Sequence, residues 1–440
     1  MSKKDTIIKG TFILTITGFL SRFIGFFYRI FLSRTFGEEG IGLYQLVFPI
    51  FALGFSFTCA GIEVALSRLT AQKVAMGKQT EAKQTLLTGL LVSFSLSLFT
   101  MLLIQKNVLW ITEHILRDVR CEHLLIAMSY IFPFSSIHSC ICGYYLGLKQ
   151  TKRIAISQLI EQIVRVLSVY LLCMFLLRQN DPLPVTVAVA GLVFGEISSA
   201  FYCIITFKNP YRLSSVTHKQ KKPYLSQVRE LLSLSLPLTA NRVLLNVLQS
   251  IEAVSIPGCL ILSGLTNSES LGLYGILTGM AMPCIFFPSA LTGSIATMLL
   301  PTIAEVDAQK DRFALIRLIR KAAGCVLCLG SICTIGFLLF GNFMGTRLFH
   351  SKVAGDFITT LAWICPFMYT NTTLISILNG LGKPSASFRI NTCGLIIRIG
   401  SVFFLIPLYG ILGYLWGLLG SQIIISFLAV WTLKKYLQKA

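Results

Sequence analysis

The chain has 440 residues, of which 54% are hydrophobic and only 13% are charged. A soluble domain is about one-quarter charged, so the composition excludes a string of water-soluble domains, which would have too few polar residues to cover their surfaces. Lysine and arginine number 38 against 18 acidic residues, which gives a formal net charge of +20. In so apolar a chain, this excess indicates loops on the cytoplasmic side of a membrane rather than binding to nucleic acid.

The N-terminal segment is basic and then apolar, with Arg22 and Arg29 interrupting the apolar run. No small-residue cleavage site follows, so this segment is predicted to be a retained transmembrane helix and not a removable signal peptide. Crossing a bilayer takes about 20 mostly apolar residues, and about twelve segments of the chain meet this requirement. They cover roughly 8–32, 42–66, 85–104, 123–147, 155–177, 184–207, 231–261, 271–300, 322–341, 355–381, 388–408 and 411–433.

The longest polar stretch, residues 208–230, divides these segments into two groups of about six. We therefore predict an N-terminal lobe over 1–207, a cytoplasmic basic linker over 208–230 and a C-terminal lobe over 231–440. If the N-terminus is cytoplasmic, the inside segments hold twenty-six lysine and arginine residues and the outside loops hold seven. This bias predicts a multi-pass protein of the cytoplasmic membrane with both termini in the cytoplasm.

The two groups of segments resemble each other, which indicates an internal repeat. Pro133 and Pro366 each precede a phenylalanine, and at the same spacing Arg165 corresponds to Arg398. Because six helices is an even number, both halves have the same orientation, as in transporters with parallel repeats. The predicted fold class is an all-α polytopic membrane protein with about twelve transmembrane helices in two six-helix lobes related by a parallel internal repeat.

Nine ionisable residues lie inside the predicted spans. A charge near the bilayer centre costs about 2.5–3.5 kcal/mol on insertion scales, so such residues face protein or a wet cavity and point to function. They are Arg22, Arg29, Glu63, Glu161, Arg165, Glu196, Arg242, Glu252 and Arg398.

Arg22 and Arg29 are seven residues apart, which places them on one face of the first helix. Two guanidinium groups on one face suit an anionic headgroup such as a pyrophosphate, because each can donate two parallel hydrogen bonds. The competing interpretation is that Arg29 extends to the membrane interface and Arg22 pairs with Glu63.

Arg242, Asn246 and Gln249 follow the spacing of one helical face in the seventh segment. A polar stripe on an apolar helix lines water or bonds to a neighbouring helix. Pro237, one turn earlier, would kink the helix, as is common at transporter sites. We predict that the stripe lines the binding cavity together with Arg22, against the competing reading of hydrogen bonding between helices.

The intramembrane acids divide into two groups. Glu161 and Arg165 have the spacing and order of a helical ion pair, so we assign them, with Arg398 of the repeat, a structural role. Glu63 and Glu252 are candidates for ion coupling, since a buried carboxyl can take up and release a proton. An ion pair with a nearby arginine explains each of these two equally well, and Glu196 is read as packed and hydrogen-bonded.

The cysteines are not expected to form disulfides, because the 13 residues are scattered, mostly within apolar runs. Cys325 and Cys328 form a C-x-x-C pair without a second ligand pair, and no two of the five histidines have metal-ligand spacing. No metal site is therefore predicted. The basic run at 219–222 sets topology or holds anionic lipid.

Several segments together resemble one transporter family. The segment KGTFILTITGFLSRFIGFFYRIFLSRTFGEEGIGLYQLVFP (9–49) looks like the start of the stage V sporulation protein B group, and GIEVALSRLTA (61–71), FPSALTGSIATMLLPTIAE (287–305) and LNGLGKP (378–384) look like its later signatures. That group belongs to the multidrug/oligosaccharidyl-lipid/polysaccharide (MOP) superfamily, with a fold like that of the multidrug exporters and murein precursor flippases.

This resemblance implies two six-helix lobes around a cavity and the flipping or export of a lipid-linked saccharide, with a lipid II-type precursor as the leading cargo. The pattern SRxxGFxxR is similar to the first helix of murein precursor flippases, where cavity arginines are thought to engage the pyrophosphate. The resemblance therefore assigns that role to Arg22 and Arg29. Many relatives have two further C-terminal helices, to which a groove for the lipid tail is assigned. With about twelve helices, this chain would lack that groove.

The sequence thus predicts a monomeric flippase, not an enzyme, that works by alternating access for cell-wall, spore-cortex or polysaccharide synthesis. No cofactor is expected, because the chain lacks a G-x-x-x-x-G-K-[ST] motif. A proton or sodium gradient or the membrane potential would drive transport. The first rival is a cation-coupled multidrug exporter of the same fold, which would need an acidic cavity. The second is a membrane enzyme acting on lipid-linked sugars, which would need clustered acids or a His–acid pair at a membrane face.

Overall fold

The computed structural model describes residues 3–179, 183–207, 224–309 and 311–439. Within these ranges the chain forms helices joined by short connections, and no β-strand occurs. This agrees with the predicted all-α fold class. Most of residues 208–230, predicted to form the basic linker, lie outside the described residues.

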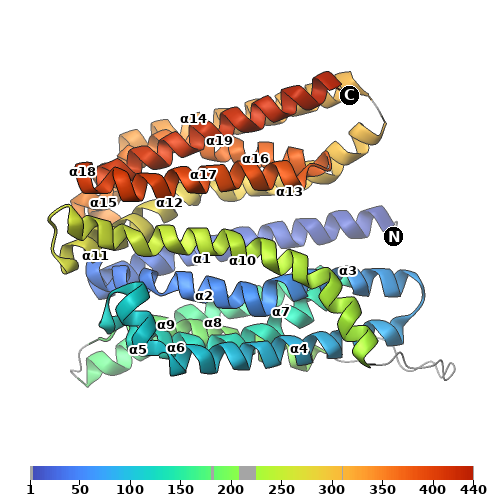
Figure 1. Cartoon of the computed structure of the whole chain (residues 1–440), viewed down its shortest axis with the longest axis horizontal. Coiled ribbons are helices and arrows are strands. Elements are labelled where there is room, and N and C mark those ends of the chain that lie inside the picture. The colour runs from blue at the N-terminus through green and yellow to red at the C-terminus, as the bar shows by residue number, and fades with distance from the viewer. Residues whose placement is uncertain (1–2, 180–182, 208–223, 310, 440) are drawn as a thin grey trace. The chain divides into compact units, whose positions relative to one another are not determined.

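The described chain up to Leu262 forms the helices α1 to α10 (Figure 1), and Gly37, with φ of 69°, kinks the first of them. A π-helical turn, Ser56–Ala60, joins α2 to α3. The helices are α1 (Lys3–Leu46), α2 (Phe48–Phe55), α3 (Gly61–Ala75), α4 (Gln79–Lys106), α5 (Val108–Trp110), α6 (Glu122–Ser129), α7 (Ile131–Gly147), α8 (Thr151–Arg178), α9 (Thr186–Thr206) and α10 (Tyr224–Leu262).

From Asn267 onward, the described chain again alternates long helices with short ones. Its helices are α11 (Asn267–Gly275), α12 (Met282–Phe286), α13 (Ser289–Ala308), α14 (Arg312–Leu348), α15 (Lys352–Leu361), α16 (Cys365–Gly380), α17 (Pro384–Phe404), α18 (Ile406–Tyr409) and α19 (Ile411–Lys439).

Nine helices of the described chain are long and apolar enough to cross a membrane, or ten if the bent pair Val119–Ser129 and Ile131–Gly147 forms one span. The stretch Thr15–Ala75 counts once among them but covers two predicted segments. The segment predicted at 388–408 is helical as α17 but is not among the nine. In the described residues, each of the twelve predicted segments is helical over most of its length. The long apolar helices make this a multi-pass membrane protein, with nine or ten candidate spans where about twelve are predicted.

The chain divides into two compact units whose limits fall inside helices. The N-terminal unit comprises Met1–Gly25 and Leu46–Ser250, and the C-terminal unit comprises Phe26–Gln45 and Ile251–Ala440. The first part of α1 thus belongs to one unit and its remainder to the other, and α10 is divided in the same way. The predicted lobe limits, 1–207 and 231–440, stay a prediction.

In the N-terminal unit, α7 packs against α3, α4 and α9, and α8 packs along α9. Lipid does not drive apolar helices together, so close packing depends on small residues. A Cβ atom at Gly143 of α7 would lie 2.6 Å from the backbone oxygen of Glu63. Only glycine lets α7 approach α3 this closely.

In the C-terminal unit, α16 packs against α13 and α14, and α17 packs along α19, as Figure 1 shows. A buried apolar cluster including Leu374, Ile377 and Ile425 fills the space beside α16 and α19. The same helix-on-helix arrangement therefore recurs in both units, as the sequence repeat predicted.

Candidate functional site

Arg242, Asn246 and Gln249 line a pocket of about 320 Å³ in the N-terminal unit. The opposite wall comes from α2 and the π turn that follows it, through Phe51, Ala52, Phe55 and Ser56. The pocket therefore has a polar side on α10 and a largely aromatic side on α2.

The polar stripe on α10 has two functions within this pocket. Asn246 donates its side-chain amide to the backbone oxygen of Ala52, at 3.2 Å, and to Ser56 Oγ. Arg242 and Gln249 are exposed at the pocket wall. The stripe thus holds α10 against α2 at its middle and leaves a guanidinium and an amide for a ligand.

Two local features shape the pocket wall that α2 and the following π turn form. The turn Ser56–Ala60 is π-helical, a distortion that is frequent at functional sites. A Cβ atom at Gly61 would lie 2.8 Å from the backbone oxygen of Ser235, so glycine lets the start of α3 approach α10.

The two arginines of the first helix are both exposed in the structure. Arg22 belongs to the N-terminal unit and Arg29 to the C-terminal unit. The predicted joint role of these two arginines with Arg242 stays a prediction.

Glu63 is half-buried on α3, close enough to Arg242 and His138 for their charges to act on its carboxylate. Glu252 is buried, with 5% of its surface exposed. It pairs with Arg398 Nη2 at 2.9 Å and accepts a hydrogen bond from Tyr414 Oη at 2.7 Å. For Glu252 the ion-pair interpretation is thus realised, and its predicted coupling role stays a prediction.

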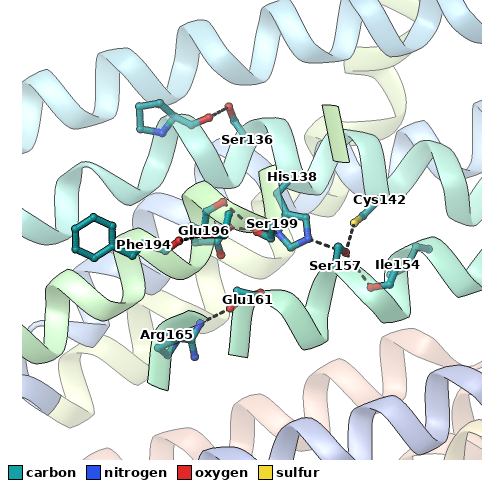
Figure 2. Close-up of polar contacts among 12 residues, drawn as sticks. Ser136, His138, Cys142, Ile154, Ser157, Glu161, Arg165, Phe194, Glu196 and Ser199 are labelled. Carbon is teal, nitrogen blue, oxygen red and sulfur yellow. Dashed lines mark hydrogen bonds and ion pairs between the residues drawn. The ribbon is translucent and has the colours of Figure 1, made fainter. Parts of the chain in front are cut away.

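Glu161 and Arg165 form the predicted ion pair on α8. The pair lies beside a polar cluster around His138 that sequence reasoning missed (Figure 2). His138 Nδ1 lies 3.2 Å from a carboxylate oxygen of Glu196, and Nε2 lies 3.2 Å from Ser157 Oγ. His138 and Cys142 are four residues apart on α7, and this spacing was the signal that sequence reasoning overlooked.

Two sets of side chains in the described residues are close enough to share a metal ion, and both include His138. One set adds Cys142 and Cys203, and the other adds Glu161 and Glu196. In each set the ligand atoms lie within 4.8 Å of one another. By contrast, Cys325 and Cys328 are exposed on α14.

A second pocket, of about 430 Å³, lies in the C-terminal unit. Glu38, Glu39 and Glu269 line it, and Glu269 also caps the start of α11. Its acidic lining separates it chemically from the arginine-bearing pocket of the N-terminal unit.

Comparisons with known proteins agree with this architecture. A family model described as "Polysaccharide biosynthesis protein" matches residues 7–307. Stage V sporulation protein B of Bacillus subtilis (strain 168) is 29% identical over 443 residues, covering 99% of this chain and 85% of that protein.

Two solved structures show the fold. A structure of the lipid II flippase MurJ in an inward closed conformation superposes with a TM-score of 0.74 at 15% identity, covering 96% of this chain and 87% of that one. An inward-facing multidrug resistance MATE family transporter of the MOP superfamily gives a TM-score of 0.72 at 14% identity, covering 96% of each chain. The chain therefore shares its fold with the MurJ and MATE structures and belongs to the polysaccharide biosynthesis protein family.

Proposed function

We propose that the protein flips a lipid-linked saccharide across the cytoplasmic membrane by alternating access, with a polyprenyl-pyrophosphate oligosaccharide of the lipid II type as its substrate. The observation that carries the proposal is the pocket on α10, where Arg242 and Gln249 stand exposed opposite aromatic side chains. A guanidinium binds phosphate oxygens through two parallel hydrogen bonds. Aromatic rings opposite it provide a surface for a sugar.

In this proposal Arg22, Arg29 and Arg242 hold the pyrophosphate, and the lipid tail stays in the bilayer. Asn246 keeps α10 against α2 through its bonds to Ala52 and Ser56, which fixes the direction in which Arg242 points. Gln249 adds an uncharged donor and acceptor for a sugar hydroxyl. The protein acts as a monomer with both termini in the cytoplasm, and no catalytic residue is needed.

The driving force is an ion gradient or the membrane potential. Moving one negative charge outward gains about 2.3 kcal/mol per 100 mV when the interior is negative. Glu63 is the better coupling candidate, because Glu252 already has Arg398 and Tyr414 as partners. The family description supports a role in polysaccharide synthesis, and the similarity to stage V sporulation protein B supports a role in sporulation.

A cation-coupled multidrug exporter is the main rival, because the MATE transporter shares the fold. A cationic drug would meet Arg242 in the pocket of the N-terminal unit, and like charges repel in a low-dielectric site. The pocket chemistry therefore favours an anionic substrate.

Reconstitution into proteoliposomes with a fluorescent polyprenyl-pyrophosphate saccharide tests the proposal. Arg242→Ala is expected to reduce the flipping rate at least tenfold, and Arg242→Lys is expected to restore only part of it, because lysine cannot bind two oxygens in parallel. Arg68→Ala is the matched control, since Arg68 is exposed on α3 outside the pocket.

Unchanged flipping by Arg242→Ala would refute the headgroup role of this residue. Efflux of a cationic dye by the wild-type protein, with no flipping of any polyprenyl-linked sugar, would support the drug exporter instead.

A further inference from the structure

The polar cluster around His138 joins three helices of the N-terminal unit, and the proposed flipping function does not use it. Figure 2 shows the His138 ring between Glu196 and Ser199 of α9 on one side and Ser157 of α8 on the other. His138 is 8% exposed and Ser157 is fully buried. The His138 ring and the Ser157 hydroxyl are therefore shielded from solvent, and their polar atoms must be satisfied from within the protein.

The hydrogen bonds around His138 fix one proton of its ring. Nδ1 lies 3.2 Å from the Glu196 carboxylate and 3.2 Å from Ser199 Oγ. The carboxylate can only accept, and the Ser199 hydroxyl donates its proton to the backbone oxygen of Glu196 at 3.0 Å. Both neighbours are therefore acceptors, so Nδ1 carries the N–H.

The other ring nitrogen is then an acceptor. Nε2 lies 3.2 Å from Ser157 Oγ, and the single proton of this hydroxyl can go to Nε2 or to the backbone oxygen of Ile154 at 2.9 Å. A neutral imidazole with its lone pair on Nε2 is the form that binds a metal ion.

Sulfur atoms surround the same point. Cys142 Sγ lies 3.6 Å from Ser157 Oγ, and the ligand atoms of His138, Cys142 and Cys203 all lie within 4.8 Å of one another. Both cysteines are free and buried. Thiolates and imidazole are the ligands that zinc prefers in structural sites.

The second unit shows how the same helices pack without these groups. At the spacing that pairs Pro133 with Pro366, His138 corresponds to Asn371. The Asn371 amide donates to Gln422 of α19 at 2.8 Å and accepts from Ser426 at 2.6 Å. Uncharged amides and a hydroxyl therefore suffice to join these two helices.

The cysteine and serine of the cluster are also absent from the repeat. At the same spacing Cys142 corresponds to Ile375, and Ser157 corresponds to Ile390. The imidazole and the thiol are therefore particular to the N-terminal unit, and helix packing alone does not account for them.

We propose that the N-terminal unit binds a divalent transition-metal ion of the zinc class through His138 Nε2 and the thiolates of Cys142 and Cys203, with Ser157 Oγ in the fourth position. Donors in a tetrahedral zinc site lie roughly 3.3–3.8 Å apart, so side-chain movements of about an ångström complete it. Two thiolates balance the charge of the ion, and binding releases the two thiol protons. Glu196 accepts from Nδ1 and orients the ring, as carboxylates, backbone carbonyls and waters do behind metal-binding histidines.

The site is structural, because all four donors come from the protein and lie buried. It ties α7, α8 and α9 together through one ion. The inference goes beyond the proposed flipping function and does not depend on the substrate.

Metal analysis of the purified full-length protein tests the proposal. The protein is isolated under reducing conditions, passed over a gel-filtration column with a mild chelator, and analysed by elemental mass spectrometry. We expect one zinc-class ion per chain in the wild-type protein and at least a tenfold lower content in Cys142→Ser/Cys203→Ser. The control is Cys325→Ser/Cys328→Ser, which removes the exposed thiol pair and is expected to keep the ion.

Cobalt substitution gives a second measurement that does not depend on a variant folding. Metal-free wild-type protein titrated with Co²⁺ is expected to show thiolate-to-cobalt charge-transfer absorption, with displacement by one equivalent of Zn²⁺. Glu196→Gln is expected to weaken Co²⁺ binding about 10–100-fold without changing the number of sites.

Three results would overturn the proposal. The first is wild-type protein without bound metal and without a cobalt spectrum. The second is equal metal content in the wild-type and the double variant, which would indicate adventitious metal. The third is a disulfide between Cys142 and Cys203 in freshly isolated protein.

Discussion

Two charged side chains within the helices form one buried link in the C-terminal unit. Glu252 of α10 pairs with Arg398 of α17 and accepts from Tyr414 of α19. Both charges of the pair are largely buried, so each depends on the other for solvation. The link connects three helices at one point.

Breaking this link on one side is expected to be costly. Glu252→Ala leaves the Arg398 guanidinium buried without its partner, which costs about 3–5 kcal/mol. Thermal unfolding in detergent measures the change. The double variant Glu252→Gln/Arg398→Gln removes both charges and is expected to recover more than half of the loss. Equal destabilisation by the single and the double variant would contradict the ion-pair account.

At the scale of helices, small residues set the distance between neighbours. The backbone of α7 contacts that of α3 at Gly143, where a Cβ would lie 2.6 Å from the backbone oxygen of Glu63. At Gly324 of α14, by contrast, no atom lies within 4 Å of the Cβ position. The two glycines therefore differ in what they do for packing.

This difference gives a matched pair of substitutions. Gly143→Ala is expected to destabilise the protein by about 1–3 kcal/mol, because backbone atoms must move apart. Gly324→Ala is expected to be neutral or stabilising by up to about 1 kcal/mol, because alanine favours the helix. Thermal unfolding of both variants in one detergent measures the contrast, and similar effects would contradict the close approach of α7 and α3.

The start of α11 is fixed by a capping box. The Thr266 hydroxyl accepts from the backbone N–H of Glu269, and the Glu269 carboxylate accepts from the backbone N–H of Thr266. Thr266→Ala is expected to cost about 1 kcal/mol. Thr346→Ala is the control, because Thr346 bonds only to carbonyls of its own helix. Faster amide hydrogen exchange in the Thr266→Ala variant, confined to the first turn of α11, would show that the lost cap causes the effect.

At the scale of the whole molecule, the charge pattern assigns each connection to one side of the membrane. The connection after α7 carries Lys149 and is predicted to be cytoplasmic. The connection after α10 contains Gly264 and is predicted to be external. This pattern predicts that both termini are cytoplasmic.

Thiol labelling of intact cells measures this topology. The background carries serine in place of Cys325 and Cys328. In it, Ser263→Cys places a reporter thiol beside the turn at Gly264. A membrane-impermeant maleimide is expected to label Ser263→Cys in intact cells and Lys149→Cys only after permeabilisation. The reverse pattern would invert the orientation and the direction of transport.

The sequence by itself determined the fold class, the positions of the helical segments and the Glu161–Arg165 pair. These follow from local patterns, because the length of an apolar run and the spacing along a helix do not depend on distant parts of the chain. It also placed Arg242, Asn246 and Gln249 on one helical face.

Only the tertiary structure decided what these faces meet. It set Asn246 against Ala52 and Ser56, gave Glu252 its partners on α17 and α19, and gathered His138, Cys142 and Cys203 from α7 and α9. Such contacts join residues far apart in the chain, and they depend on which faces of the helices pack together. Because lipid is as apolar as the helix surfaces, hydrophobicity alone does not choose those faces, and small residues and polar partners do.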